Sequence, residues 1–117
     1  MGYEVKNLRV YTEAHKLLKM CYERYSDSKE FWLKDQILRS AGSIGANIAE
    51  MCGYESSSMK YHKCSIALGE ANEVMFWLET LKENDKDIIE QVHVVQKMLF
   101  SLRNKFSVSD KRLAGGD

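Results

Sequence analysis

The sequence predicts an all-α protein that folds as an up-down-up-down antiparallel four-helix bundle. Apolar residues recur at steps of three and four along most of the 117 residues, which is the period of helices buried on one side. Proline is absent and β-structure has little support. The connections are short, about three to six residues, and short connections make neighbouring helices antiparallel. The length is that of one domain with a modest core.

The four helices are expected at about residues 7–25, 30–52, 57–83 and 87–106 of a single domain, 1–117. Ser26-Asp27-Ser28 forms the first connection, and Gly53 ends the second helix. Ser56, Ser57 and Ser58 supply capping hydroxyls for the third helix, and Asp87 with Glu90 resembles a capping box for the fourth. Residues 107–117 are expected to form a flexible tail.

The periodicity also predicts which side chains form the core. The first helix contributes Leu8, Tyr11, Ala14, Leu18, Cys21 and Tyr25, with Leu17 alongside, and the second contributes Leu33, Ile37, Ala41, Ile44 and Ile48. The third contributes Tyr61, Cys64, Ala67 or Leu68, Ala71, Val74, Leu78 and Leu81, and the fourth contributes Ile88, Val92, Val95, Leu99, Leu102 and Phe106.

The second helix contains an uncharged run from Ser40 to Ala49, in a chain of which 29% is charged. Its surface away from the core carries small residues: Gly42, Gly45, Ala46 and Ala49. Each helix-interior glycine costs about 1 kcal/mol relative to alanine, and close approach of another backbone would offset that. We therefore expect these residues to form an oligomer contact. The alternative is a loop, because Ser, Gly and Asn favour turns, but the unbroken apolar spacing favours a helix.

A polar stripe accompanies the small residues along the second helix. It consists of Gln36, Ser40, Ser43, Asn47 and Glu50, with Arg39 beside it and Glu73 on the third helix as a partner for Arg39. Buried polar groups must be hydrogen-bonded, because an unsatisfied one costs roughly 1–3 kcal/mol. The stripe therefore predicts either a network that holds the helices in register or a groove for a ligand or partner, and we favour the network.

The charges balance overall but are unevenly distributed. Seventeen basic and seventeen acidic residues leave no overall excess of positive charge, which nucleic-acid-binding proteins usually have. Glu70 to Glu90 nevertheless holds seven acids and two lysines, a net charge of −5, and Lys97 to Arg112 holds five bases and one acid, a net charge of +4. This polarity is compatible with head-to-tail association, with an anionic partner, or with ordinary solvated helix surface, of which the last is the commonest case.

Neither a membrane nor secretion is indicated. No apolar run approaches the roughly 20 residues of a membrane span, and the N-terminus lacks the apolar segment of a secretory signal. Cys21, Cys52 and Cys64 are odd in number and lack C-x-x-C spacing, which is typical of buried free thiols in a reducing compartment. We expect a cytoplasmic protein.

No catalytic or metal site is expected. Di-iron bundles need a Glu-x-x-His on each of two helices plus two further glutamates. This chain has one such pair, Glu90 and His93, with Glu50 and Glu73 as the conceivable glutamates, and no second Glu-x-x-His. Its serines lie in turns or on small-residue faces, and no glycine-rich loop follows a strand. The sequence predicts no metal, no cofactor, no small-molecule substrate and no enzymatic activity.

Two runs resemble a known family. Residues 36–50, QILRSAGSIGANIAE, resemble the run Q-L-R-R-A-A-x-S-I-P-A-N-I-A-E-G of the bacterial 23S rRNA intervening-sequence proteins, and residues 66–73, IALGEANE, resemble their I-A-x-G-S-A-x-E. The likeness extends in outline from about Leu8 to Phe106. The matching positions of the proposed network are Gln36, Arg39, Ser43, Asn47, Glu50, Gly69 and Glu73. Departures are Gly45 for proline, Met51 for glycine and Glu70 for serine.

The resemblance implies a four-helix bundle in a closed homo-oligomer, a pentamer in known relatives, with no enzymatic activity assigned. We therefore expect a scaffold or adaptor, with RNA or an RNA-associated protein as a candidate partner. The alternative is a nucleic-acid-binding accessory factor like the related accessory variability determinant of diversity-generating retroelements, which is strongly basic. The candidate contacts for nucleic acid are Lys60, Lys63, Arg103, Lys105, Lys111 and Arg112.

Overall fold

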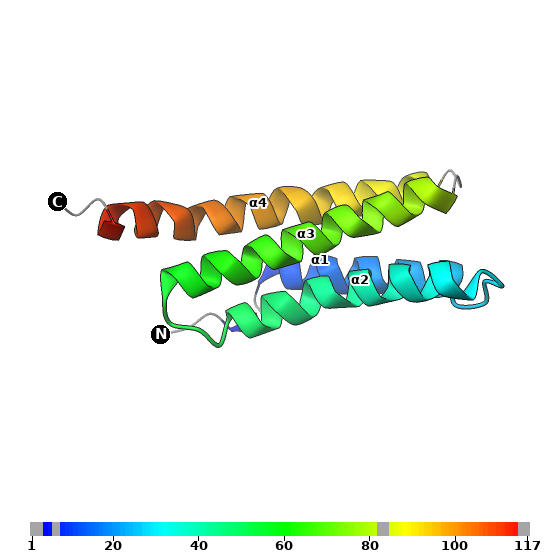
Figure 1. Cartoon of the computed structure of the whole chain (residues 1–117), viewed down its shortest axis with the longest axis horizontal. Coiled ribbons are helices and arrows are strands. Elements are labelled where there is room, and N and C mark those ends of the chain that lie inside the picture. The colour runs from blue at the N-terminus through cyan, green and yellow to red at the C-terminus, as the bar shows by residue number, and fades with distance from the viewer. Residues whose placement is uncertain (1–3, 6–7, 82–84, 115–117) are drawn as a thin grey trace.

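The computed structural model describes residues 4–5, 8–81 and 85–114, with side chains as far as residue 107. These residues form the helices α1 (Arg9–Tyr25), α2 (Phe31–Met51), α3 (Ser57–Leu81) and α4 (Lys86–Ala114). Successive helices run in opposite directions, and α4 packs against α1 as well as α3, which closes the bundle (Figure 1). The fold is therefore the predicted up-down-up-down bundle, drawn out into a rod of 56 × 24 × 22 Å.

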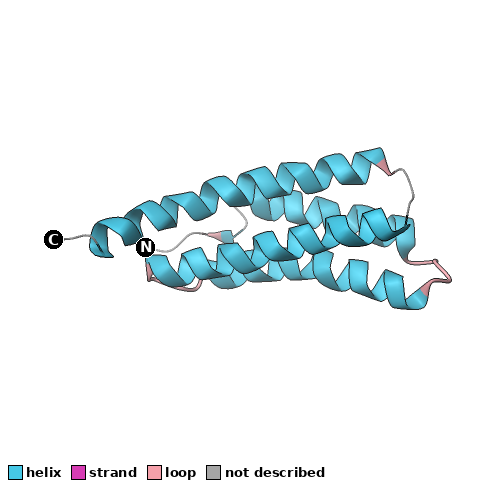
Figure 2. Ribbon diagram, turned by 45° about the horizontal axis from the view of Figure 1, so that its top comes forward, coloured by secondary structure: helices cyan, strands magenta, loops and turns pink. Residues whose placement is uncertain are grey.

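The helix ends follow local capping chemistry. Ser56 Oγ accepts a hydrogen bond from Met59 N at 3.1 Å, so a serine caps α3 as predicted. The Ser28 hydroxyl accepts from Glu30 N at 3.1 Å in the connection before α2. Past the end of α2, Gly53 N donates to Glu50 O at 2.9 Å. Short connections join the helices over the described part of the chain (Figure 2).

The predicted capping box at Asp87 is displaced, because α4 already begins at Lys86. Asp87 therefore lies inside the first turn, where its negative charge favours the helix N-terminus. The first main-chain bond of α4 runs from Ile89 N to Asp85 O at 3.0 Å. Asp85 occupies the position before the helix, and its side chain serves a tertiary contact described below.

One apolar core runs the length of the bundle. Every predicted core position of α2 and α4 is buried. In α3, Tyr61, Leu68 and Leu81 are only partly buried around the core. In α1 the predicted residues Ala14, Leu17, Cys21 and Tyr25 are buried, whereas Leu8, Tyr11 and Leu18 are only partly buried and Val10 joins the core. Neighbouring apolar residues shared that face of α1, so periodicity alone left the choice to packing.

The far end of α4 differs from the sequence-based expectation. The helix was expected to end at Phe106 with a flexible tail, but it continues to Ala114. The last turns of α4 project beyond the ends of the other helices (Figure 1). The reason is local, since Ser107–Leu113 contains no glycine or proline and the first helix breaker is Gly115. Residues 115–117 of the predicted tail lie outside the described part of the chain.

The described helices differ in character from membrane spans. None of them combines the length and the apolar character that crossing a bilayer would demand.

Candidate functional site

The small residues of α2 line a groove between α1 and α2. The groove has a volume of about 200 Å3. Its walls are Tyr11, Ala14, His15 and Leu18 from α1 and Ala41, Gly42, Gly45, Ala46 and Ala49 from α2. Within this single chain Gly45 is buried, Gly42 and Ala49 are half-buried, and Ala46 is exposed. The chain's own α1 therefore shelters one edge of the small-residue surface and leaves the rest open.

The two glycines of this groove are not needed for packing inside the chain. A Cβ added to Gly42 would lie 4.0 Å from Leu18 Cδ1. One added to Gly45 would lie 4.0 Å from Ala14 Cβ and from His15 Cδ2. These are ordinary van der Waals distances, so alanine would fit at both positions. Each glycine still carries a helix-propensity cost of about 1 kcal/mol.

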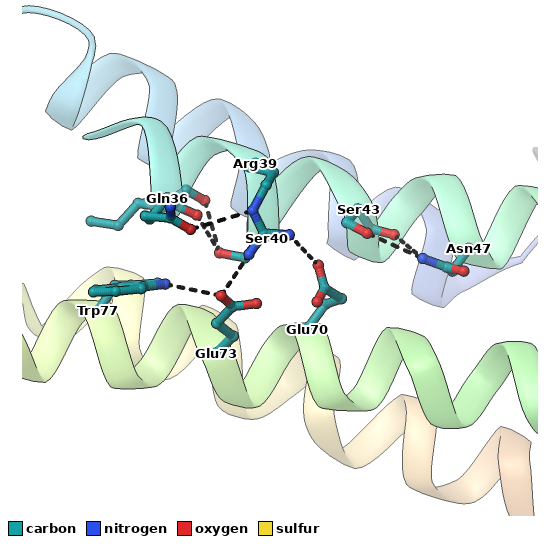
Figure 3. A network of polar contacts seen from close by, with 9 residues as sticks. Gln36, Arg39, Ser40, Ser43, Asn47, Glu70, Glu73 and Trp77 are labelled. Carbon is teal, nitrogen blue, oxygen red and sulfur yellow. Dashed lines mark hydrogen bonds and ion pairs between the residues drawn. The ribbon is translucent and has the colours of Figure 1, made fainter. Parts of the chain in front are cut away.

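The predicted partnership of Arg39 with α3 is present, and it is broader than expected. Arg39 Nη2 lies 2.5 Å from Glu73 Oε1, and Arg39 Nη1 lies 3.1 Å from Glu70 Oε2 (Figure 3). Gln36 Oε1 accepts from Arg39 Nε at 3.4 Å, and Trp77 Nε1 donates to Glu73 at 3.3 Å. Glu70, noted only as a departure from the family pattern, is thus a second anionic partner of the guanidinium.

This arrangement is an exposed clamp between α2 and α3. The Arg39 side chain is 50% exposed. Its hydrogen bond to Glu73 is the main cause of a raised Arg39 pKa, and the same bond holds the pKa of Glu73 below its ordinary value. Solvent-exposed ion pairs contribute little stability, so we assign the clamp to the register of α2 against α3.

The other members of the polar stripe behave differently. Ser40 is fully buried and donates to Gln36 O at 2.7 Å, while Asn47 Nδ2 donates to Ser43 O at 2.8 Å, so these bonds remain within α2 (Figure 3). Glu50 reaches across to Lys63 Nζ on α3 at 3.1 Å. The short side chains therefore make their hydrogen bonds within α2. The contacts that fix the register of α2 against α3 come from the long charged side chains.

Gly69 differs from the other signature residues because it has no side chain to contribute. It is exposed on α3, and a Cβ added there would meet no neighbouring side chain within 4 Å. It therefore adds no side-chain contact to the polar network, although its chain neighbour Glu70 belongs to that network.

The candidate nucleic-acid contacts gather at one end of the bundle, where three of the four with described side chains are buried or engaged within the chain. Lys60 is 6% exposed. Lys63 pairs with Glu50, and Arg103 lies over the rings of Tyr61 and Phe100, with centroid distances of 5.4 and 5.3 Å. Lys105 is exposed. Lys111 and Arg112 are on the projecting helical segment of α4, where only the backbone is described.

An exposed aromatic surface, which the core periodicity did not predict, lies at the opposite end. We define it as Phe31, Trp32, Phe76 and Trp77. Phe31, Trp32 and Phe76 are 66%, 59% and 58% exposed. The Trp32 and Trp77 rings meet edge-on at a centroid distance of 6.0 Å, and Phe76 and Trp77 at 4.9 Å. The feature of the sequence that could have predicted this surface is the presence of aromatic residues at positions outside the apolar core period.

Two further polar contacts link helices distant in the sequence. The Tyr25 hydroxyl and Arg24 Nε both donate to the Asp85 carboxylate, the latter at 3.0 Å, which ties the end of α1 to the start of α4. Gln91, 6% exposed, donates through Nε2 to Glu13 O at 3.0 Å and to Glu13 Oε1 at 2.9 Å. Single polar residues of this kind give no periodic signal, so only the fold identifies their partners.

The cysteines and histidines are the side chains best suited to nucleophilic or metal chemistry. Burial raises the pKa of the Cys21 thiol to about 12 and that of Cys64 to about 11, and it also raises the pKa of Cys52. His93 is exposed and hydrogen-bonds to Gln96 at 3.0 Å. Among the described residues, no three His, Cys, Asp or Glu side chains come together as a metal site would require.

The comparisons with known proteins agree with this bundle. A family model described as "23S rRNA-intervening sequence protein" matches residues 6–106. The chain belongs to the 23S rRNA-intervening sequence protein family. Its fold is also similar to a crystal structure of a protein of unknown function from the S23 ribosomal protein family of Bacteroides thetaiotaomicron, with 32% sequence identity and a TM-score of 0.70. That match covers 81% of this chain and 95% of the other. No curated protein matches.

Proposed function

We propose that this member of the 23S rRNA-intervening sequence protein family is a non-enzymatic scaffold or adaptor that assembles with copies of itself through the α1–α2 groove. The observation that carries the proposal is the pair of glycines in the middle of α2. Alanine would fit at both within one chain, so their helix-propensity cost has no reason inside the monomer.

Close contact with a second chain would explain why glycine stands at both positions. The exposed Ala46 and the half-buried Gly42 and Ala49 leave the α2 backbone accessible from outside. Small residues at a contact let two helix axes approach to about 8 Å, the lower end of the usual range. A closed ring, with the pentamer expected from the family resemblance, would cover this surface on every subunit.

A matched pair of glycine substitutions tests the assembly. Gly42→Ala and Gly69→Ala both replace a helix-interior glycine where the chain has room for a methyl group. Both should raise helix stability by up to about 1 kcal/mol. Of this pair, only Gly42→Ala is expected to weaken association. Ala46→Leu should weaken it more strongly. Multi-angle light scattering across a dilution series measures both effects.

The proposal fails if wild-type protein has the mass of one chain at all concentrations. It also fails if Gly42→Ala and Ala46→Leu leave the mass and its concentration dependence unchanged. Circular dichroism on each variant separates loss of assembly from loss of fold.

The partner we propose for the assembled scaffold is RNA or an RNA-associated protein in the cytoplasm. The family description names an intervening sequence of 23S rRNA, which supports an RNA-linked role. Direct binding, the alternative function, has weaker support because Lys60 is buried and Lys63 is paired with Glu50. Titration of labelled RNA and DNA at low and high salt separates the two: salt-sensitive binding would favour the nucleic-acid-binding factor.

A further inference from the structure

The fold separates charge along the rod although the chain is neutral overall. The end where α1 and α3 finish and α2 and α4 begin holds the described residues 23–39, 70–81 and 85–90, with ten acids and five bases. The opposite end holds the described residues 4–5, 8–13, 50–63 and 97–112, with five acids and eight bases. Over these residues the acidic end therefore carries a net charge of −5 and the basic end a net charge of +3.

These charges act as two separate fields. The rod is 56 Å long, whereas the Debye length is about 10 Å at 0.1 M salt. The ends therefore do not cancel each other for a partner that approaches along the axis. Ion pairs such as Arg24–Asp85 and Lys63–Glu50 join groups at the same end, so they leave the net charge of each end unchanged.

The acidic end also carries the aromatic surface. Phe31, Trp32 and Phe76 are each more than half exposed, and the exposed carboxylates of Asp35 and Glu79 lie on the same two helices, within three residues of an exposed ring. Exposed aromatic faces beside carboxylates suit Lys and Arg side chains, which gain cation–π contacts as well as charge pairing. The surface is therefore chemically suited to a basic partner.

The basic end presents such a partner. The final turns of α4 project beyond the other helices, and this segment carries Lys111 and Arg112 (Figure 1). We infer that two copies associate end to end, with the basic end of one, led by the projecting part of α4, docked on the acidic aromatic end of the next. Such a head-to-tail contact leaves complementary ends free and can propagate.

This contact is independent of the lateral assembly proposed above. A ring of parallel bundles would have one acidic aromatic face and one basic face, and would stack as a single chain would. Packing at the α1–α2 groove is largely apolar and resists salt, whereas association of oppositely charged ends weakens steeply as salt rises. The mass at high salt therefore gives the size of the assembly formed through the α1–α2 groove. Any increase in mass at low salt measures the end-to-end contact.

Sedimentation velocity on the purified full chain, at about 50 mM and about 500 mM NaCl, tests the inference. We expect low-salt species whose masses are multiples of the high-salt unit. The variant Glu79→Lys should weaken this association about tenfold or more. The matched control, Glu55→Lys, makes the same charge change at an exposed position of the basic end and should leave it intact or strengthen it.

A mixing experiment tests direction. One variant, Asp35→Lys with Glu79→Lys, has a disabled acidic end, and the other, Lys111→Glu with Arg112→Glu, has a disabled basic end. Each alone should keep the high-salt mass at low salt, and their mixture should form pairs of units and nothing larger. Equal wild-type masses at both salts, a mixture that forms no pairs, or low-salt species that form only with added RNA would each overturn the inference.

Discussion

At the scale of single residues, the polar contacts of this bundle differ in what they contribute. The Arg39 clamp is exposed, so breaking it should change stability little. Asp85 is different, because its side chain is 12% exposed and receives bonds from two donors on α1. Burial alone would raise the pKa of Asp85, but the bonds from Tyr25 and Arg24 outweigh burial and hold the pKa below its ordinary value of 3.8.

The substitution Asp85→Asn should therefore destabilise the bundle in a pH-dependent way. Hydrogen bonds to a charged group contribute about 1.5–3 kcal/mol, and asparagine retains only part of that. Because the folded-state pKa is depressed, the contribution is complete above the unfolded-state value near 3.8 and is lost as pH falls through the folded-state pKa. Urea unfolding at about pH 7 and about pH 3 measures this. A difference between wild type and Asp85→Asn that persists unchanged at the lower pH would contradict the assignment.

At the scale of elements, periodicity located the helices because each buries one stripe. All five predicted core residues of α2 are buried, and the spacing across Gly42 and Gly45 was unbroken, as a helix requires. In α1 adjacent apolar residues made two stripes possible, and packing in the bundle buried Val10 and Leu17 but left Leu8, Tyr11 and Leu18 partly exposed. The end of α4 was missed because core spacing stops at Phe106, although nothing before Gly115 interrupts the helix.

Removing residues 108–117 should separate the contribution of α4 to the core from its contribution to end-to-end association. Phe106 is the last core residue of the helix among the described side chains, so we expect a change in unfolding free energy of about 1 kcal/mol or less. Helical ellipticity should fall by the contribution of residues 108–114. Salt-dependent end-to-end association should fall sharply, because Lys111 and Arg112 are removed. A large drop in thermal stability would show instead that this segment packs on the bundle.

At the scale of the whole molecule, one continuous core encloses two of the thiols. Cys21 and Cys64 have no exposed surface, whereas Cys52 is half-buried near the end of α2. A buried thiol with a pKa raised to about 12 or 11 reacts only after the bundle opens. Opening should therefore be cooperative for the thiols on α1 and α3.

Pulsed alkylation followed by mass spectrometry should label Cys52 first, and Cys21 and Cys64 together at a slower rate that rises with urea. The variant Cys52→Ser removes the early label and serves as the control. Labelling of Cys21 at the rate of Cys52 would mean that α1 detaches separately from the rest of the bundle.

The sequence by itself determined the helices and their antiparallel order, because helical period and short connections constrain both locally, and it indicated Glu73 as a partner for Arg39. Only the tertiary structure identified Glu70 as a second partner of Arg39 and Asp85 as the partner of Tyr25, since neither pair has a fixed spacing along the chain. It also decided that charges from four helices add up to one acidic and one basic end. The physical reason is that antiparallel packing places the end of one helix beside the start of the next, so remote residues share one surface.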